Sequence, residues 1–405
     1  MKKGACIIGQ SGGPTAVINS SLLGIIEKSL SENAFTAVYG ALNGIDGVIN
    51  EHIINFDQYT KEELQLLKTT PSSILGSVRY KLPEDLNDEI YTKIENVFKK
   101  YNITCFYYIG GNDSMDTCLK LSKYFKKVNF DCHAIGIPKT IDNDMQYIDH
   151  TPGYASAAKF IYTSIAEIYE DITCYKKGRV TIVEIMGRDS GWLTCASKIA
   201  AHFGKGPDLI YIPEATFNKD QFLIDVNKIY QNKQRVLIAV SEGIKDESGN
   251  CFTMASINNK NDIFGHQQLG GVGTILAQLV DQKLNLPVRS IELNLLQRCA
   301  SHLLSKTDID EAYECGAYGV TLYQQGVTGK MVSMKRKDDS NYQIEYEPID
   351  LDKIANYVRE VPKEYINKEG NFITDEFLKY ILPLVQGEIN LPFENGFPKF
   401  FKLKK

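Results

Sequence analysis

Short apolar segments alternate along the chain with longer segments whose apolar residues recur every three or four positions. The first apolar segment, 5–9, is followed by a glycine-rich loop and then by helical spacing from Thr15 to Leu30. The same order returns at 105–109, where a second glycine-rich loop leads into helical spacing through Met115. Strands that alternate with helices in this way predict a parallel sheet covered by helices.

Four more apolar segments have the length of strands, and each ends in polar residues: 133–137, 179–185, 208–212 and 236–240. In open parallel sheets, ligands collect beyond the carboxyl ends of the strands, where loops and helix N-termini meet. We therefore expect the functional residues of this chain in the loops that follow its strands.

Length and composition narrow the class of protein. A chain of 405 residues exceeds what one hydrophobic core usually serves, so two or three α/β lobes are expected. The formal net charge of −5 gives no general reason to bind nucleic acid, so a phosphorylated substrate must meet local lysines and arginines. Nine cysteines without a CxxC pair predict reduced thiols and a cytoplasmic location. No apolar run approaches the thickness of a bilayer, so neither secretion nor a membrane location is expected.

The two glycine-rich loops are Ser11-Gly12-Gly13 and Gly110-Gly-Asn-Asp-Ser114. Small residues at the turn from strand to helix let backbone N–H groups approach an anion, of which phosphate is the commonest. One such loop alone would more often be a tight turn, and two at strand ends favour phosphate binding. Neither loop matches GxxxxGK[ST] or GxGxxG, so a Walker-type nucleotide site and a dinucleotide site have little support.

The segment Pro138-Lys-Thr-Ile-Asp-Asn-Asp144 holds a lysine, a hydroxyl and two carboxylates within seven residues. A carboxylate such as Asp142 can remove a proton from a sugar hydroxyl, and a cation such as Lys139 can face a migrating phosphoryl group. On residue types alone, a solvated turn rich in Asn and Asp is an equal alternative.

Arginines accompany several of the expected strands. Arg179 and Arg188 flank the strand at 179–185, and Arg289 and Arg298 lie in a later polar-apolar stretch. Guanidinium groups at strand ends suit phosphate recognition, although a surface position is commoner for any single arginine. The six histidines show no metal-ligand spacing, so zinc catalysis is not indicated.

Taken together and in order, these motifs resemble the phosphofructokinase family. The motifs that carry the resemblance are Ser11-Gly-Gly13, Gly76-Ser-Val-Arg79, Gly110-Gly-Asn-Asp-Ser114, Pro138-Lys-Thr-Ile-Asp-Asn-Asp144, Met186-Gly-Arg188, Glu242 and Gln297-Arg298. The resemblance spans roughly residues 4–320, and the C-terminal tail carries no motif of the family. It implies an α/β fold with two similar lobes, each a parallel-type sheet flanked by helices, and an active-site cleft between the lobes.

The resemblance also implies a division of labour between the lobes. Residues 1–150 with about 298–345 would form the lobe that binds the phosphoryl donor, pyrophosphate. Residues 151–297 with part of the tail would form the lobe that binds fructose 6-phosphate, and about 323–405 would form a peripheral extension.

Roles for single residues follow from the same resemblance. Asp142 would be the catalytic base, assisted by Lys139, Asp113 and Arg188. Pyrophosphate would be bound by Gly12, Gly13, Arg79, Gly111 and Ser114. The sugar phosphate would be bound by Thr140, Asp142, Asp144, Met186, Gly187, Arg188, Glu242 and Arg298. Arg179 and Arg289 match arginines that reach the substrate of a neighbouring subunit, which implies a homodimer or homotetramer.

Two positions indicate whether the phosphoryl donor is pyrophosphate or ATP. Relatives that use ATP carry glycine where this chain has Asp113 and Lys139, and both substitutions resemble the pyrophosphate-dependent branch of the family. A carboxylate at Asp113 would repel the α-phosphate of ATP, which pyrophosphate lacks, and Lys139 would add a cation near the leaving group. The alternatives are an ATP-dependent phosphofructokinase and a non-catalytic regulatory subunit that binds sugar phosphates.

The expected metal is Mg²⁺. Asn112 stands where relatives usually place a magnesium-binding aspartate, and a neutral amide is the weaker ligand. Whether Asn112 or the adjacent Asp113 contacts the metal stays open.

Overall fold

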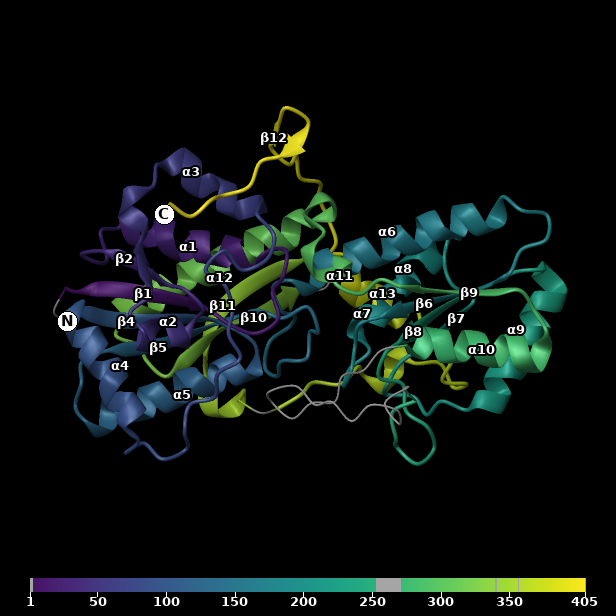
Figure 1. The fold of residues 1–405 in the computed structure, drawn as a ribbon, viewed down its shortest axis with the longest axis horizontal. Helices are drawn as coiled ribbons and strands as arrows, with labels where there is room; N and C mark the ends of the chain where they lie inside the picture. Colours follow the sequence, from purple (N-terminus) through teal and green to yellow (C-terminus); the bar gives the residue numbers. More distant parts are fainter. Residues whose placement is uncertain (1–2, 253–270, 339–340, 356, 405) are drawn as a thin grey trace.

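The computed structural model describes residues 3–252, 271–338, 341–355 and 357–404. Within these ranges, two sheets form the centres of two lobes that lie side by side (Figure 1). The larger sheet has the strand order β11-β10-β5-β4-β1-β2-β3. Its strands are β1 (Ala5–Gln10), β2 (Val38–Ala41), β3 (Ile53–Asn55), β4 (Ile103–Gly110), β5 (His133–Pro138), β10 (Lys330–Asp338) and β11 (Gln343–Asp350).

The interior of the larger sheet is parallel, and antiparallel strands close both edges. Strand β1 pairs in parallel with β2 and β4, and β5 pairs in parallel with β4 and β10, whereas β3 and β11 run antiparallel to their neighbours. Every residue of β1, β4 and β5 is buried, because helices cover both faces of the sheet. Figure 1 shows α1 and α12 along one side and α4 and α5 along the other. The helices of this lobe are α1 (Ile18–Ser31), α2 (Ile45–Ile49), α3 (Lys61–Gln65), α4 (Glu89–Lys100), α5 (Asn112–Lys127) and α12 (Lys306–Gln324).

The smaller sheet is parallel throughout, with the order β7-β8-β6-β9. Alternate residues of β6 pack on opposite faces: Val183 and Ile185 contact the core beneath α6 and α7, and Val180 and Ile182 contact the core beneath α9 and α10. The strands are β6 (Val180–Ile185), β7 (Leu209–Tyr211), β8 (Val236–Ser241) and β9 (Val288–Glu292). The helices are α6 (Tyr154–Thr173), α7 (Trp192–Cys195), α8 (Ser197–His202), α9 (Lys219–Lys233), α10 (Val272–Leu284) and α11 (Leu296–Cys299).

The α/β fold with two mainly parallel sheets confirms the fold class expected from the sequence. The six expected strands all form, although β7 is shorter than the segment 208–212. Helix α1 begins at Ile18 and not at Thr15, because the loop after β1 extends through Val17 before the helix starts. None of the helices in the described residues combines the length and the apolar character that crossing a membrane requires.

The C-terminal segment contributes to both lobes, although the sequence suggests a peripheral extension there. Strands β10 and β11 complete one side of the larger sheet, and Phe377 of α13 (Glu376–Ile381) is buried in the core of the second lobe. The chain then passes through the hairpin of β12 (Phe393–Glu394) and β13 (Phe397–Pro398) and ends beside α3 (Figure 1). There Phe401 is buried in the first lobe, with its ring centre 5.0 Å from that of Tyr59.

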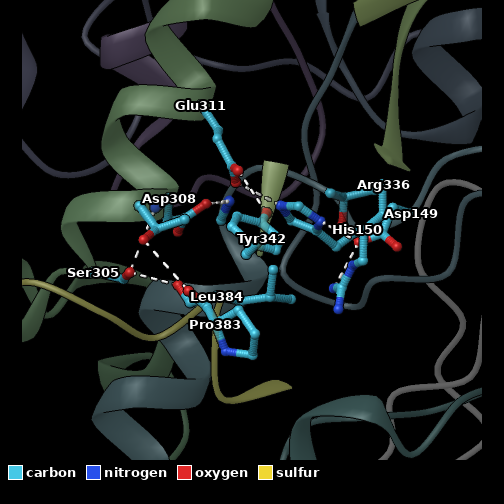
Figure 2. A network of polar contacts seen from close by, with 12 residues as sticks. Asp149, His150, Ser305, Asp308, Glu311, Arg336, Tyr342, Pro383 and Leu384 are labelled. Atoms are coloured by element: carbon cyan, nitrogen blue, oxygen red, sulfur yellow. Dashed lines mark hydrogen bonds and ion pairs between the residues drawn. The ribbon is translucent and has the colours of Figure 1, made fainter. Parts of the chain in front are cut away.

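A buried polar network joins α12 to the loop that precedes α6 (Figure 2). The ring of His150 is fully buried, with Nδ1 2.8 Å from Oδ1 of Asp149 and Nε2 2.7 Å from Oε2 of Glu311. Burial alone would lower the pKa of His150, but the two carboxylates outweigh it and raise the pKa to about 9, so the ring is protonated at neutral pH. One turn earlier on α12, Asp308 accepts hydrogen bonds of 2.9 Å from two backbone N–H groups at the start of α6.

Candidate active site

A cleft of about 440 Å³ opens where the loops after β1, β4 and β5 meet the loops after β6 and β8. These are the carboxyl ends of parallel strands, where α/β proteins usually bind ligands. The residues that line the cleft are Gly12, Gly13, Pro14, Arg79, Gly111, Asn112, Asp113, Ser114, Lys139, Thr140, Ile141, Asp142, Asp144, Met186, Arg188, Asp189, Ser190, Glu242, Arg298 and Val358. The structure therefore brings most of the candidate residues to one place.

The two glycine-rich loops form one wall of the cleft. Gly12 has φ of +76°, a left-handed conformation that glycine adopts without strain, and its carbonyl accepts a 2.6 Å hydrogen bond from Ser77 Oγ. Gly111 is the N-cap of α5, so the first backbone N–H groups of this 16-residue helix lie beside the cleft. The partial positive charge of a helix N-terminus stabilises an anion, and this wall is suited to bind phosphate.

Lys139 ties the segment after β5 to the loop after β1. Its side chain is buried, and Nζ donates hydrogen bonds to the carbonyl oxygens of Ser11 at 2.8 Å and Gly13 at 2.6 Å. Burial, helped by the nearby charge of Arg298, lowers the pKa of Lys139 to about 8, although the two aspartates in the cleft oppose this shift. The ammonium group thus holds the glycine-rich loop that follows β1, and its lowered pKa lets it lose its proton at mildly alkaline pH.

Asp142 and Asp144 lie next to each other in the cleft, and both are partly exposed. Burial raises the pKa of Asp142, while Thr140, whose Oγ1 donates to Asp142 Oδ2 at 3.3 Å, opposes that shift. Burial and the charge of Asp142 raise the pKa of Asp144 to about 7. Carboxyl groups whose pKa values lie nearer neutrality than usual are suited to accept and release protons during catalysis.

The opposite wall of the cleft comes from the second lobe. Gly187 lies between the lining residues Met186 and Arg188 directly after β6, and its N–H donates to Oε1 of Glu242 at 3.2 Å. Its φ is +146°, and a Cβ there would lie 2.6 Å from the carbonyl oxygen of Ser190, so only glycine fits. Burial raises the pKa of Glu242, and Nε of Arg188 is buried without a hydrogen-bond partner in the described residues. Glu242 and Arg188 are therefore available to form hydrogen bonds with a polar ligand.

The start of α5 presents oxygen atoms that suit a divalent metal. Oδ1 of Asn112 is buried without a hydrogen-bond partner among the described residues, and Asp113 beside it lines the cleft. The described ranges contain no cluster of three or more His, Cys, Asp or Glu side chains that could hold a metal by themselves. This arrangement fits a metal such as Mg²⁺, which usually binds one or two protein oxygens together with substrate phosphates and water.

Arg179 and Arg289 lie away from this cleft. They line a separate groove of about 650 Å³ between α6 and the sheet edge at β9. Arg179 directly precedes β6 and Arg289 is the second residue of β9, so both stand near the amino ends of their strands, opposite the loops that form the cleft. Within one chain they cannot contact a ligand bound there.

Sequence reasoning missed several residues that line the cleft. Asp189 and Ser190 directly follow the motif at Met186–Arg188, so extending that motif by two residues would have found them. Val358 lies in the C-terminal segment, far along the chain and without a recognisable motif, so no local pattern could have pointed to it.

Comparison with known proteins adds to this geometry. The family described as phosphofructokinase matches residues 5–303. The pyrophosphate–fructose 6-phosphate 1-phosphotransferase of Halomonas elongata is 39% identical, covering 98% of this chain and 95% of its own. The sulfofructose kinase of Alkalicoccus urumqiensis is 31% identical over 93% of this chain and 95% of its own. The crystal structure of a pyrophosphate-dependent phosphofructokinase from Nitrosospira multiformis superimposes with a TM-score of 0.89 at 33% identity, covering 98% and 96% of the two chains.

Proposed function

The chain belongs to the phosphofructokinase family, and we propose that it transfers a phosphoryl group reversibly from pyrophosphate to the 1-hydroxyl of fructose 6-phosphate. The products are fructose 1,6-bisphosphate and phosphate, as in a step of glycolysis and gluconeogenesis. The choice of pyrophosphate as the donor rests on Asp113 and Lys139, both of which line the cleft. The carboxylate repels the α-phosphate of a nucleotide, and the buried ammonium supplies positive charge beside the loop at Gly12 and Gly13.

The proposed binding mode places one substrate on each wall. Pyrophosphate lies against the loop at Gly12 and Gly13, the N-terminus of α5 and the exposed Arg79, all of which line the cleft. The sugar phosphate lies against the second lobe. Its contacts there are assigned to Met186, Gly187, Arg188, Glu242 and Arg298, and Thr140 and Asp144, which follow β5 of the first lobe, contact it from the other side.

In the proposed reaction, Asp142 accepts the proton of the sugar 1-hydroxyl while that oxygen attacks a phosphorus atom of pyrophosphate. A new P–O bond forms, the bridging P–O bond breaks, and phosphate leaves with the bonding electron pair. Lys139 and Arg188 stabilise the negative charge on the transferring group. The reverse reaction follows the same path, with Asp142 returning the proton.

Members of this family generally use a divalent metal, and we assign Mg²⁺ to Asn112 and Asp113. When bound with pyrophosphate, Mg²⁺ neutralises phosphate charge. We also propose a cytoplasmic location, because all nine cysteines are free thiols, as is usual in a reducing compartment. Activity should accompany a cytoplasmic marker when cells are fractionated.

We propose that the protein is a homodimer or homotetramer in which Arg179 and Arg289 reach the sugar phosphate of a neighbouring subunit. Their position in a groove remote from their own cleft supports this assignment. Replacing Arg289 with glutamine should raise KM for fructose 6-phosphate by roughly tenfold or more, since a hydrogen bond to a charged group is lost, and leave KM for pyrophosphate unchanged. A sedimentation experiment should find a dimer or tetramer. A monomer, or an unchanged KM for the sugar, would contradict the proposal.

The proposed function is tested by pairing each donor, pyrophosphate or ATP, with each acceptor, fructose 6-phosphate or sedoheptulose 7-phosphate. Each pair is measured with Mg²⁺ and with a chelator. We expect turnover with pyrophosphate, fructose 6-phosphate and Mg²⁺, and little with ATP. Comparable rates with ATP would reverse the donor assignment, and sugar-phosphate binding without turnover on either donor would indicate a regulatory subunit.

A further inference from the structure

Arg359 lies in the C-terminal segment, outside the residues 5–303 that match the family. Its guanidinium group donates to three backbone carbonyls of the loop that carries Asp142. Nη1 donates to Ile148 O at 2.6 Å and to Asp149 O at 2.7 Å. Nε and Nη2 donate to Asn143 O at 3.2 Å and 3.0 Å. One side chain thus spans both ends of this loop.

The backbone of Arg359 also holds the loop, and the side chain is itself held in place. Its N–H donates to Asp144 O at 2.6 Å, and its carbonyl accepts a hydrogen bond of 3.1 Å from Nε1 of Trp192. The guanidinium carbon lies 4.6 Å from the centre of a ring of Trp192, which permits a cation–π contact. Because the guanidinium group of Arg359 is itself held in place, its hydrogen bonds can fix the conformation of the loop.

The loop requires such external support. Asn143 and Tyr147 have φ of +55° and +56°, a left-handed conformation that asparagine adopts more readily than most residues and that is unfavourable for the bulky tyrosine. Asn143 stands directly between Asp142 and Asp144, and it is fully buried. An irregular backbone cannot pair its own carbonyls in a ladder, so Arg359 supplies the missing donors.

We propose that Arg359 is a positioning residue for phosphoryl transfer, which fixes the backbone around Asn143 so that the carboxylates of Asp142 and Asp144 face the reacting groups. Arg359 does not line the cleft, so it acts through the loop. The inference rests on the proposed function and deepens it, because it gives the C-terminal segment a part in catalysis.

Arg359 has an electrostatic effect in addition to its geometric one. Its charge lowers the pKa of Asp144, opposing burial and the charge of Asp142, which raise it. Removing the charge should therefore raise the pKa of Asp144 further, whereas a lysine would keep the charge but not the forked set of donors. These two effects can be separated by two substitutions.

The experiment compares Arg359→Lys and Arg359→Met with a matched control, Arg235→Lys. Arg235 also donates to a backbone carbonyl, that of Thr173 at 3.3 Å, but it does not line the cleft. Steady-state kinetics with pyrophosphate and fructose 6-phosphate are measured across pH, and thermal unfolding and fructose 6-phosphate binding are measured for each protein.

We expect both Arg359 variants to fold and to lose roughly tenfold to a hundredfold in kcat, with KM for both substrates near that of the wild type, because small misplacements of a catalytic group are costly. Arg359→Met should also shift the acid limb of kcat/KM to higher pH, which Arg359→Lys and Arg235→Lys should not do. If the methionine variant fails to fold, the kcat of the lysine variant alone tests whether Arg359 positions the loop.

The inference is overturned if a folded Arg359 variant keeps the kcat of the wild type, or if its loss of activity lies in KM for fructose 6-phosphate with kcat unchanged. It is likewise overturned if Arg235→Lys loses as much activity as the Arg359 variants. An inactive wild-type protein would instead refute the proposed function, and the two failures are therefore distinguishable.

Discussion

Replacing Asp142 with asparagine should lower kcat by roughly a hundredfold to ten-thousandfold, the usual contribution of a general base. Asparagine has the shape of aspartate, so Thr140, which donates to Asp142 Oδ2, keeps a partner in the amide oxygen. The amide cannot accept the proton of the sugar hydroxyl at neutral pH. The loss should therefore fall on the chemical step, and binding of fructose 6-phosphate should remain measurable.

The loss is measured by rapid-quench kinetics with saturating pyrophosphate and fructose 6-phosphate, and binding by calorimetry. Asp131→Asn is the matched control, because Asp131 is exposed and does not line the cleft. An Asp142→Asn enzyme with a chemical step near that of the wild type would remove Asp142 from its role as the base.

Replacing Lys139 with methionine should lower kcat/KM for pyrophosphate by roughly a hundredfold to a thousandfold, since a preorganised charge at the transferring group is lost. Two carbonyls of the glycine-rich loop, those of Ser11 and Gly13, also lose their donor. KM for fructose 6-phosphate should change much less, because Lys139 and the carbonyls that it contacts lie on the side of the cleft assigned to pyrophosphate.

The role of Lys139 also predicts how activity changes with pH. The pKa of Lys139 is lowered to about 8 by burial, so the free enzyme loses this charge as pH rises through 8, and kcat/KM for pyrophosphate should fall there. For the same reason, the unfolded chain binds more protons than the folded one between about pH 8 and 10.5. The buried charge of Lys139 destabilises the fold below pH 8, and this destabilisation is relieved as pH rises through that range.

Kinetics from pH 6 to 10 and thermal unfolding at pH 7 check both parts. The methionine variant should lack the alkaline limb and should unfold no more than a few degrees below the wild type. A methionine variant that binds pyrophosphate normally and keeps the alkaline limb would contradict the proposed role of Lys139.

The parts of the fold that the sequence predicted are those in which a local pattern has a direct structural cause. Strands β1, β4, β5, β6 and β8 are wholly buried, so each appears as a run of apolar residues. Strand β11 lies at an edge of its sheet, has no fully buried residue and contains three carboxylates and a proline, so its composition resembles that of a loop.

The same distinction explains what could be predicted of the site. Gly12, Asn112, Lys139 and Asp142 follow buried strands directly, so the topology of a parallel sheet brings them together. Arg359 reaches the loop only through tertiary packing of the C-terminal segment, and nothing in its neighbouring sequence indicates its partner. Residues brought to a site by such packing leave no periodic signal.

The position of β10 has a consequence for how the protein is made. Strand β10 covers the free edge of β5, with Lys330 opposite Ile135, and α12 packs on α1, yet both elements follow all four strands of the smaller sheet in the chain. A ribosome needs on the order of ten seconds or more to make the intervening residues. During that time β5 is an open edge that another nascent chain can pair with. We expect the first lobe to depend on chaperones during translation more than the second lobe, whose strands are contiguous in the sequence.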